Sequence, residues 1–149
     1  GNNAGDGLVA GRILASEGAH ATAVLTSDRH SELTKLNLAR FPGRVVGLDA
    51  IAREIARADL VIDGLLGVGL SRAPEGAVAR AIRACTDGTA PILAVDVPSG
   101  VDADTGWIPG DAITARATVT FTGYKPGLLF VPGVEHAGTV EVADIGIPD

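Results

Sequence analysis

Three glycine-containing loops carry the polar residues that could bind a ligand. They are residues 1–7 (GNNAGDG), 63–72 (DGLLGVGLSR) and 96–106 (DVPSGVDADTG). Glycine lets the backbone come close to a bound molecule, and a helix starting at the first loop would present unpaired N–H groups and the positive end of its dipole to a phosphate. The Asn and Asp side chains add oxygens that suit a cation. These residue types therefore predict a site for a polar, phosphorylated ligand.

Each loop also has a purely structural interpretation. A glycine-rich segment is often only a turn, and an Asp at the end of a strand, such as Asp63, often caps a helix or forms a turn. Asp102 and Asp104 are expected to be turn and solvent residues for the same reason. The sequence contains no G-x-G-x-x-G fingerprint, no Walker A lysine and no G-x-S-x-G elbow. Only the occurrence of all three loops on one edge of a sheet favours a binding site.

The elements that would place these loops together alternate along the chain. Apolar strands separated by helices predict an α/β fold with a doubly wound, mostly parallel sheet and helices on both faces, a Rossmann-like three-layer sandwich. In such a sheet ligands bind beyond the carboxyl ends of the strands, where the three loops lie. Residues 102–115 predict a long loop or a small hairpin. Helices are expected at 6–17 (with Asp6 as the cap), 31–40, 51–57 and 75–85, and strands at 22–26, 45–48, 60–63, 91–95, 117–121 and 140–144.

The composition of the chain argues against several classes of protein. The chain has 149 residues with a net charge of −6, which argues against a general nucleic-acid binder. No apolar run approaches the roughly 18 residues of a membrane span, so no membrane partner is expected. Cys85 is single, which excludes a disulfide framework, and the three His residues lack metal-ligand spacing. We expect a cytoplasmic protein. The chain starts with Gly and contains no Met, which predicts a piece of a longer protein.

Five motifs in order resemble those of the NAD(P)H-hydrate epimerase family, the YjeF N-terminal domain. They are GNNAGDG, DGLLGVGL, AVDVPSGVDADTG, ATVTFTGYKPGL and GTVEVADIGIP. The resemblance extends over nearly the whole chain and implies a single domain at 1–149. The family also has an N-terminal helix and a first strand ahead of the Asn-Asn motif, so the resemblance implies that this sequence lacks both.

The resemblance implies an isomerase of cofactor repair. Hydration of NADH or NADPH at the nicotinamide ring gives R and S epimers of an inactive cofactor. The epimerase interconverts the two forms so that an S-specific, ATP- or ADP-dependent dehydratase can restore the cofactor. The resemblance also implies a homodimer and functional coupling to that dehydratase, which is fused to the epimerase in some family members.

The family's site residues can be transferred onto this sequence. The resemblance implies a potassium ion held by Asn3, Asp63 and Ser99, and Asp96 is the expected general acid or base. Arg72 could pair with the substrate diphosphate. Lys125 matches a lysine of the family pattern, and both a substrate contact and a surface position remain open for it. Loss and re-addition of water and opening of the ring both remain open as the route of inversion. The hydrated dinucleotide would be bound by Asn2, Asn3, Ala4, Gly5, Asp6, Gly67, Val68, Gly69, Leu70, Ser71, Arg72, Ala73 and Asp96.

Two departures and two alternatives remain. Ala4 stands where the family usually has Gly and is tolerable only if its φ is negative, and Arg116 stands where an acidic or amide residue is common. One alternative function is a non-catalytic nucleotide- or partner-binding scaffold module of the same fold. The other is an unrelated dinucleotide-dependent oxidoreductase, because Asp28 lies 21 residues after Gly7, a spacing that suits a ribose contact.

Overall fold

Helices and strands alternate through residues 3–146, the part of the chain that the computed structural model describes. The helices are α1 (Asn3–Ser16), α2 (Glu32–Ala39), α3 (Ile51–Ile55), α4 (Gly76–Asp87) and α5 (Val134–Ala137), with 3-10 turns η1 (Leu48–Ala50) and η2 (Pro126–Leu128). The strands are β1 (Thr22–Leu25), β2 (Arg44–Gly47), β3 (Val61–Asp63), β4 (Ile92–Val95), β5 (Ala117–Phe121) and β6 (Thr139–Ala143). Within the described residues no helix combines the length and apolar character needed to cross a membrane.

Every pair of neighbouring strands is parallel, which confirms the predicted α/β class. One sheet has the order β1-β2 and the other the order β3-β4-β5-β6. The expected single sheet is therefore divided, because β1 and β3 are not hydrogen-bonded to each other. The sequence of β4 is continuously apolar because the strand has a partner on each side and helices on both faces.

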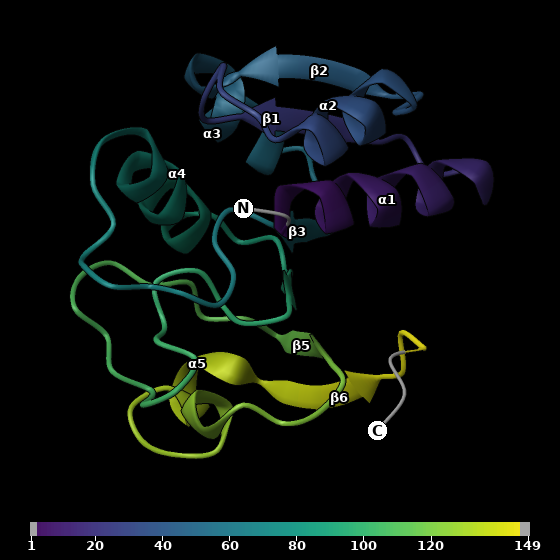
Figure 1. Cartoon of the computed structure of the whole chain (residues 1–149). Helices are drawn as coiled ribbons and strands as arrows, with labels where there is room; N and C mark the ends of the chain where they lie inside the picture. The colour runs from purple at the N-terminus through teal and green to yellow at the C-terminus, as the bar shows by residue number, and fades with distance from the viewer. Residues whose placement is uncertain (1–2, 147–149) are drawn as a thin grey trace.

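The helices cover both faces of the larger sheet (Figure 1). Ile92 and Ala94 of β4 pack with Ile82 and Cys85 of α4 in the main hydrophobic core. Successive side chains of a strand point to opposite faces, and α1 also contacts β4 as well as β1 and β3. We therefore place α1, with α2 packed against it, on the face opposite α4, which packs with α3.

A second hydrophobic cluster fixes the long segment after β4. Val97, Val101 and Ala103 pack with Leu128 of η2 and Ala137 of α5. Residues 102–115 contain no strand and no helix, so the loop alternative is confirmed and the hairpin alternative is wrong. The segment that carries the third polar motif is consequently held by its own apolar core.

The start of α1 differs from the prediction. The helix begins at Asn3, so Asp6 lies within its first turns and does not cap it. Tertiary contacts explain the difference. The Asn3 side chain donates a hydrogen bond to the Leu66 carbonyl (2.7 Å), and Gly5 is buried so closely against α2 that a Cβ would lie 3.2 Å from Asn37 Nδ2. These contacts outweigh the poor intrinsic helix propensity of Gly and Asn.

Candidate functional site

The carboxyl ends of β3 and β4 bring the predicted polar residues together. Asp63 is the last residue of β3, and Asp96 directly follows β4. The first turn of α1 lies at the same edge of the sheet, since Asn3 is hydrogen-bonded to the loop that follows β3. Two separate groups of contacts result, one around Asp63 and one around Asp96.

Asp63 is a buried carboxylate surrounded by neutral donors. The residue is 2% exposed. Ser99 donates to both carboxylate oxygens, through its backbone N–H to Oδ2 (2.8 Å) and through its hydroxyl to Oδ1, and Leu65 N donates to Oδ1 (3.2 Å). Burial raises the pKa of Asp63, and these hydrogen bonds offset part of the rise. No Lys, Arg or His of residues 3–146 forms an ion pair with it.

The three residues expected to hold potassium belong to one hydrogen-bonded cluster. Leu66 connects them, because its carbonyl accepts from Asn3 and its N–H donates to the Ser99 hydroxyl (2.9 Å), which is itself bound to Asp63. Among the described residues no three His, Cys, Asp or Glu side chains converge on one point. One carboxylate with amide, hydroxyl and carbonyl oxygens is a donor set that suits a large monovalent cation, and the negative charge of buried Asp63 fits such an ion.

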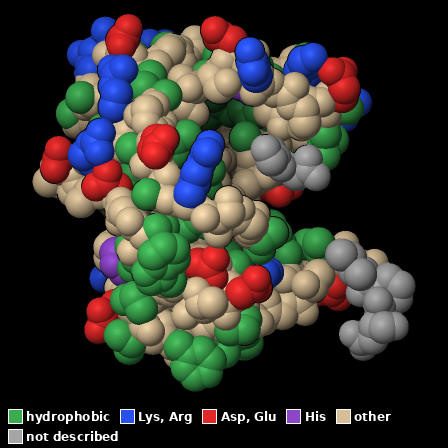
Figure 2. All heavy atoms as spheres, turned by 60° about the vertical axis from the view of Figure 1, so that its left-hand side comes forward, with side chains coloured by type: hydrophobic (Ala, Val, Ile, Leu, Met, Phe, Trp, Pro, Cys, Tyr) green, Lys and Arg blue, Asp and Glu red, His purple; other side chains and the backbone are tan. Residues whose placement is uncertain are grey.

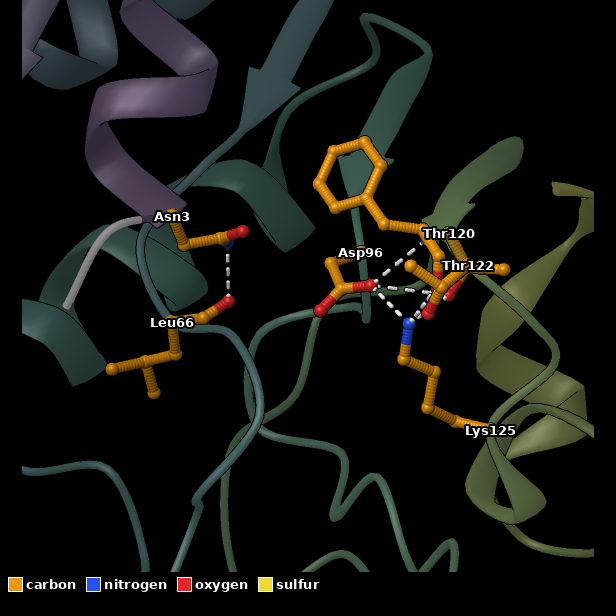
Figure 3. Close-up of polar contacts among 7 residues, drawn as sticks. Asn3, Leu66, Asp96, Thr120, Thr122 and Lys125 are labelled. Atoms are coloured by element: carbon orange, nitrogen blue, oxygen red, sulfur yellow. Dashed lines mark hydrogen bonds and ion pairs between the residues drawn. The ribbon is translucent and has the colours of Figure 1, made fainter. Parts of the chain in front are cut away.

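Asp96 is held through one of its two carboxylate oxygens (Figure 3). Oδ1 accepts hydrogen bonds from Thr120 Oγ1 (3.1 Å), Phe121 N (3.2 Å) and Lys125 Nζ (2.6 Å). Within residues 3–146, Oδ2 accepts none of the hydrogen bonds found. The backbone of Asp96 has φ 69°, in the left-handed region that Asp tolerates better than most residues. A strained backbone thus presents a carboxylate with one free oxygen.

Lys125 is not a surface residue. In its ion pair with Asp96 the two side chains are 19% and 13% exposed. The ammonium also donates to Thr120 Oγ1 (2.8 Å) and to the Phe121 carbonyl (2.7 Å). The surface alternative is therefore wrong. The sequence offered little sign of this pairing, because the turn between β5 and η2 decides where the lysine points.

Asp6 lies near enough to Asp96 to feel its charge. Loss of part of its hydration raises the pKa of the Asp6 carboxyl, and the negative charge of Asp96 adds to the rise. Ala4 is helical and its φ is not positive, so the condition for replacing Gly is met. Asn2 lies outside the described residues.

The loop after β3 lines a cavity of about 390 Å³. Asn3 closes one side of it, and Gly67 approaches Asn3 so closely that a Cβ would lie 3.3 Å from the Asn3 Cβ atom. A second cavity, of about 280 Å³, lies at the opposite, amino-terminal ends of β4 and β5 near Arg116. The predicted residues that line the first cavity are Asn3, Gly67, Val68, Gly69, Leu70, Ser71, Arg72 and Ala73.

Asp102 and Asp28 lie apart from the contacts around Asp63 and Asp96. Asp102 is a turn residue, as predicted, since its Oδ1 accepts from Asp104 N (3.1 Å) and Thr105 N (2.8 Å). Asp28, the candidate ribose contact of the oxidoreductase alternative, is exposed after β1. Neither residue makes a hydrogen bond to the groups around Asp63 or Asp96 among the contacts of residues 3–146.

Comparisons with known proteins agree over most of the chain. The sequence pattern of the family described as "YjeF-related protein N-terminus" matches residues 1–127. The NAD(P)H-hydrate epimerase of Levilactobacillus brevis is 40% identical over 99% of this chain and 69% of that protein. The bifunctional NAD(P)H-hydrate repair enzyme Nnr of Hyperthermus butylicus is 41% identical, over 99% of this chain but only 29% of that protein. The crystal structure of yeast ynu0 superimposes with a TM-score of 0.76 at 25% identity, covering 99% of this chain and 64% of that one.

Proposed function

Because the chain belongs to the family of YjeF-related N-terminal domains, several of whose curated members are NAD(P)H-hydrate epimerases, we propose that it interconverts the R and S epimers of hydrated NADH and NADPH. It is then an isomerase of nicotinamide cofactor repair. The observation that best supports this function is the Asp96 carboxylate, which residues 3–146 hold through Oδ1 and leave free at Oδ2, at the same sheet edge as the loop cavity.

The cavity after β3 is the proposed place for the dinucleotide. Its glycines, Gly67 and Gly69, let backbone N–H groups approach a diphosphate, and Arg72 is exposed at the same cavity with a guanidinium that can pair with a phosphate. Residues Asn2 to Asp6 would complete the site, and the start of α1 at Asn3 adds the positive end of a helix dipole. In this arrangement the nicotinamide ring would lie toward Asp96.

Asp96 would exchange a proton with the hydroxyl of the hydrated ring. In one route the hydroxyl takes a proton, its C–O bond breaks to release water, and the ring nitrogen stabilises the cation until water adds to the other face and returns the proton. In the other route a base takes the hydroxyl proton while the adjacent C–N bond breaks and the nitrogen is protonated, and closure from the other face reverses these changes. Both need a group that accepts and returns one proton, which a carboxylate with one free oxygen supplies.

We propose potassium as the ion of the Asp63 cluster. Asn3, Asp63 and Ser99 would hold it, and the bound ion would supply positive charge near the phosphate site. The support is the buried carboxylate of Asp63, whose hydrogen-bond donors among the described residues are all neutral. The residues themselves join the start of α1 to the loops that follow β3 and β4.

The proposed partners follow from the relatives. The bifunctional repair enzymes from two archaea support functional coupling to a dehydratase that uses the S epimer. We also propose a homodimer, for which exposed apolar side chains near η2 provide a surface. A cytoplasmic location remains part of the proposal.

The direct test is conversion of purified R-hydrate of NADH, followed by chromatography that separates the epimers. We expect conversion above the spontaneous rate, and a fall in rate of about 10²–10⁴-fold in Asp96→Asn, the range typical of a lost general acid or base. Asp104→Asn, an exposed turn residue in the same loop, is the matched control and should retain full activity. Binding of the hydrate by a folded protein without conversion would instead favour the scaffold alternative.

A further inference from the structure

We propose that Lys125 is a positioning residue that locks the Asp96 carboxylate through Oδ1, so that Oδ2 alone meets the ligand. The inference rests on the proposed function, because it assigns a task within the same site. Lys125 acts through Asp96 and not on the substrate. Three features of the structure support this assignment.

The first feature is the saturation of the lysine ammonium. An ammonium group has three N–H donors and no acceptor. Lys125 Nζ lies 2.6 Å from Asp96 Oδ1, 2.8 Å from Thr120 Oγ1 and 2.7 Å from the Phe121 carbonyl oxygen, so each donor has a protein acceptor. No N–H remains for a diphosphate or a ring hydroxyl. The alternative of a direct substrate contact is therefore disfavoured by the geometry of the ammonium itself.

The second feature is the asymmetry of the Asp96 carboxylate (Figure 3). Oδ1 accepts from Lys125 Nζ, Thr120 Oγ1 and Phe121 N, more donors than the two lone pairs of a carboxylate oxygen serve well. Thr120 is fully buried and links the other two residues, because its hydroxyl accepts from Lys125 and donates to Asp96. Rotation of the carboxylate would break these contacts, so Oδ2 is the oxygen left for a ligand.

The third feature is backbone strain at two residues near the lysine. Within residues 3–146, Asp96 (φ 69°) and Thr122 (φ 63°) are the non-glycine residues with positive φ. The left-handed conformation is costly for a β-branched residue such as Thr122. The Thr122 hydroxyl donates to the Phe121 carbonyl (2.7 Å), the same oxygen that accepts from Lys125. Strain persists where the surroundings over-determine it, and it gathers at functional sites.

The charges around Asp96 explain why a cation is needed at this point. Asp6 of α1 is a second carboxyl, and its charge interacts with that of Asp96. Among the described residues Lys125 is the one basic side chain that forms an ion pair with Asp96. Without it, repulsion from Asp6 would favour turning the Asp96 carboxylate out of its place. The lysine therefore opposes the displacement that the neighbouring carboxyl promotes.

The test compares Lys125→Met and Lys125→Arg with the wild-type protein in the epimerisation assay. Lys125→Met should lower kcat by about 10–100-fold while KM stays within about twofold, because positioning at the reacting centre is lost and substrate binding is not. Lys125→Arg keeps the charge and should recover part of kcat. Ethylammonium added to Lys125→Ala should restore activity, whereas choline should not. Lys35→Met, which removes an exposed lysine paired with Glu32, is the control and should change neither constant.

A readout independent of activity separates this inference from the proposed function. Phe121 N–H is bound to Asp96 Oδ1, so its hydrogen exchange should become faster in Lys125→Met if the carboxylate leaves its place. Unchanged exchange, or a raised KM with an unchanged kcat, would overturn the positioning role. If exchange responds while the wild-type protein fails to convert either epimer, the proposed function is wrong and the lock on Asp96 stands. Lys125→Ala gives the same comparison should Lys125→Met not fold.

Discussion

Asp63 shows how one buried carboxylate can affect the stability of the folded protein. Its carboxylate is bound by Ser99 and Leu65 and by no cation of the described residues. A buried carboxylate with neutral donors is costly to ionise, which is the cause of its raised pKa. An ion that binds only the folded protein would remove this cost and stabilise the fold.

Potassium should therefore raise the stability of the protein, most clearly near neutral pH. Because the folded-state pKa of Asp63 is raised above its ordinary value of 3.8, its contribution to stability is complete below 3.8 and is lost as the pH rises through the folded-state value. In choline chloride the free energy of unfolding should fall as the pH increases from 4 to 7. Potassium at a hundredfold excess over its Kd should restore about 2.7 kcal/mol and flatten this dependence.

Urea unfolding at equal ionic strength in potassium and choline salts checks this expectation. Asp63→Asn should make the two salts equivalent, since its amide provides no negative charge for the ion. Wild-type protein that is equally stable in both salts at pH 7 would count against an ion at Asp63.

The residue types of the site could be predicted from the sequence, but their contacts could not. The loops that begin with Asp63 and Asp96 were found because the ends of parallel strands must meet at one sheet edge, whereas the role of Ser99 came from the resemblance. The bond between Lys125 and Asp96 depends on the left-handed backbone of Thr122, which no residue preference predicts for a β-branched side chain. Asn2 is named only by the resemblance and remains a prediction.

The segment after β4 owes its course to Gly100. This residue has φ 97°, and a Cβ would overlap the Asp111 carbonyl and lie 2.7 Å from Ala112 Cα. Gly69 in the loop after β3 has a similar φ of 96° with no atom within 4 Å of the same position. Substitutions at Gly100 and Gly69 therefore distinguish the cost of a left-handed backbone from the cost of crowding around an added Cβ.

Gly100→Ala should destabilise the protein by about 3 kcal/mol or more, because left-handed strain and overpacking add. Gly69→Ala should cost only about 1 kcal/mol, the strain alone. Thermal or urea unfolding of both variants gives the comparison. Equal losses for the two would show that the backbone around Asp111 moves aside, and that the course of this segment is not fixed by Gly100.

Long helices with a periodic apolar pattern were predicted well, whereas the ends of helices and the shortest helical turns were predicted poorly. The amphipathic α4 places Ile82 and Cys85 in the core as its pattern indicates. The start of α1 was missed because Asn3 and Gly5 are helical through contacts with Leu66 and α2. These partners lie outside the short stretch of sequence from which a helix start is predicted. The short α5 and η2 were missed because four or three residues carry no periodicity.

At the level of the molecule, the division between β1 and β3 was not expected from the sequence. Both strands contact α1 without pairing with each other.

Apolar side chains gather on the part of the molecule around η2 (Figure 2). Leu129, Phe130 and Val131 are exposed, and Trp107 adjoins them because Gly106 lies against the backbone of residues 127, 130 and 133. We propose this surface as the dimer contact. Specific interfaces bury about 800 Å² on each partner and are rich in aromatic residues.

Phe130→Glu should therefore shift the protein toward monomer, because it places a charge in an apolar contact. Analytical ultracentrifugation over a range of concentrations measures the change. Ile13→Glu, at an exposed apolar position of α1, is the control and should leave the association constant unaltered. A wild-type protein that is monomeric at all concentrations would remove the homodimer from the proposal.

Trp107 gives the molecule an optical signal of its own. It is the single tryptophan of the sequence, and the residue is 59% exposed. Its carbonyl accepts a hydrogen bond from Asp102 N in the loop that begins with Asp96. Because the chain has one indole, its tryptophan fluorescence reports on the surroundings of Trp107. Burial of that indole shifts its emission to shorter wavelength, so contacts formed at this surface can be followed in real time without an attached dye.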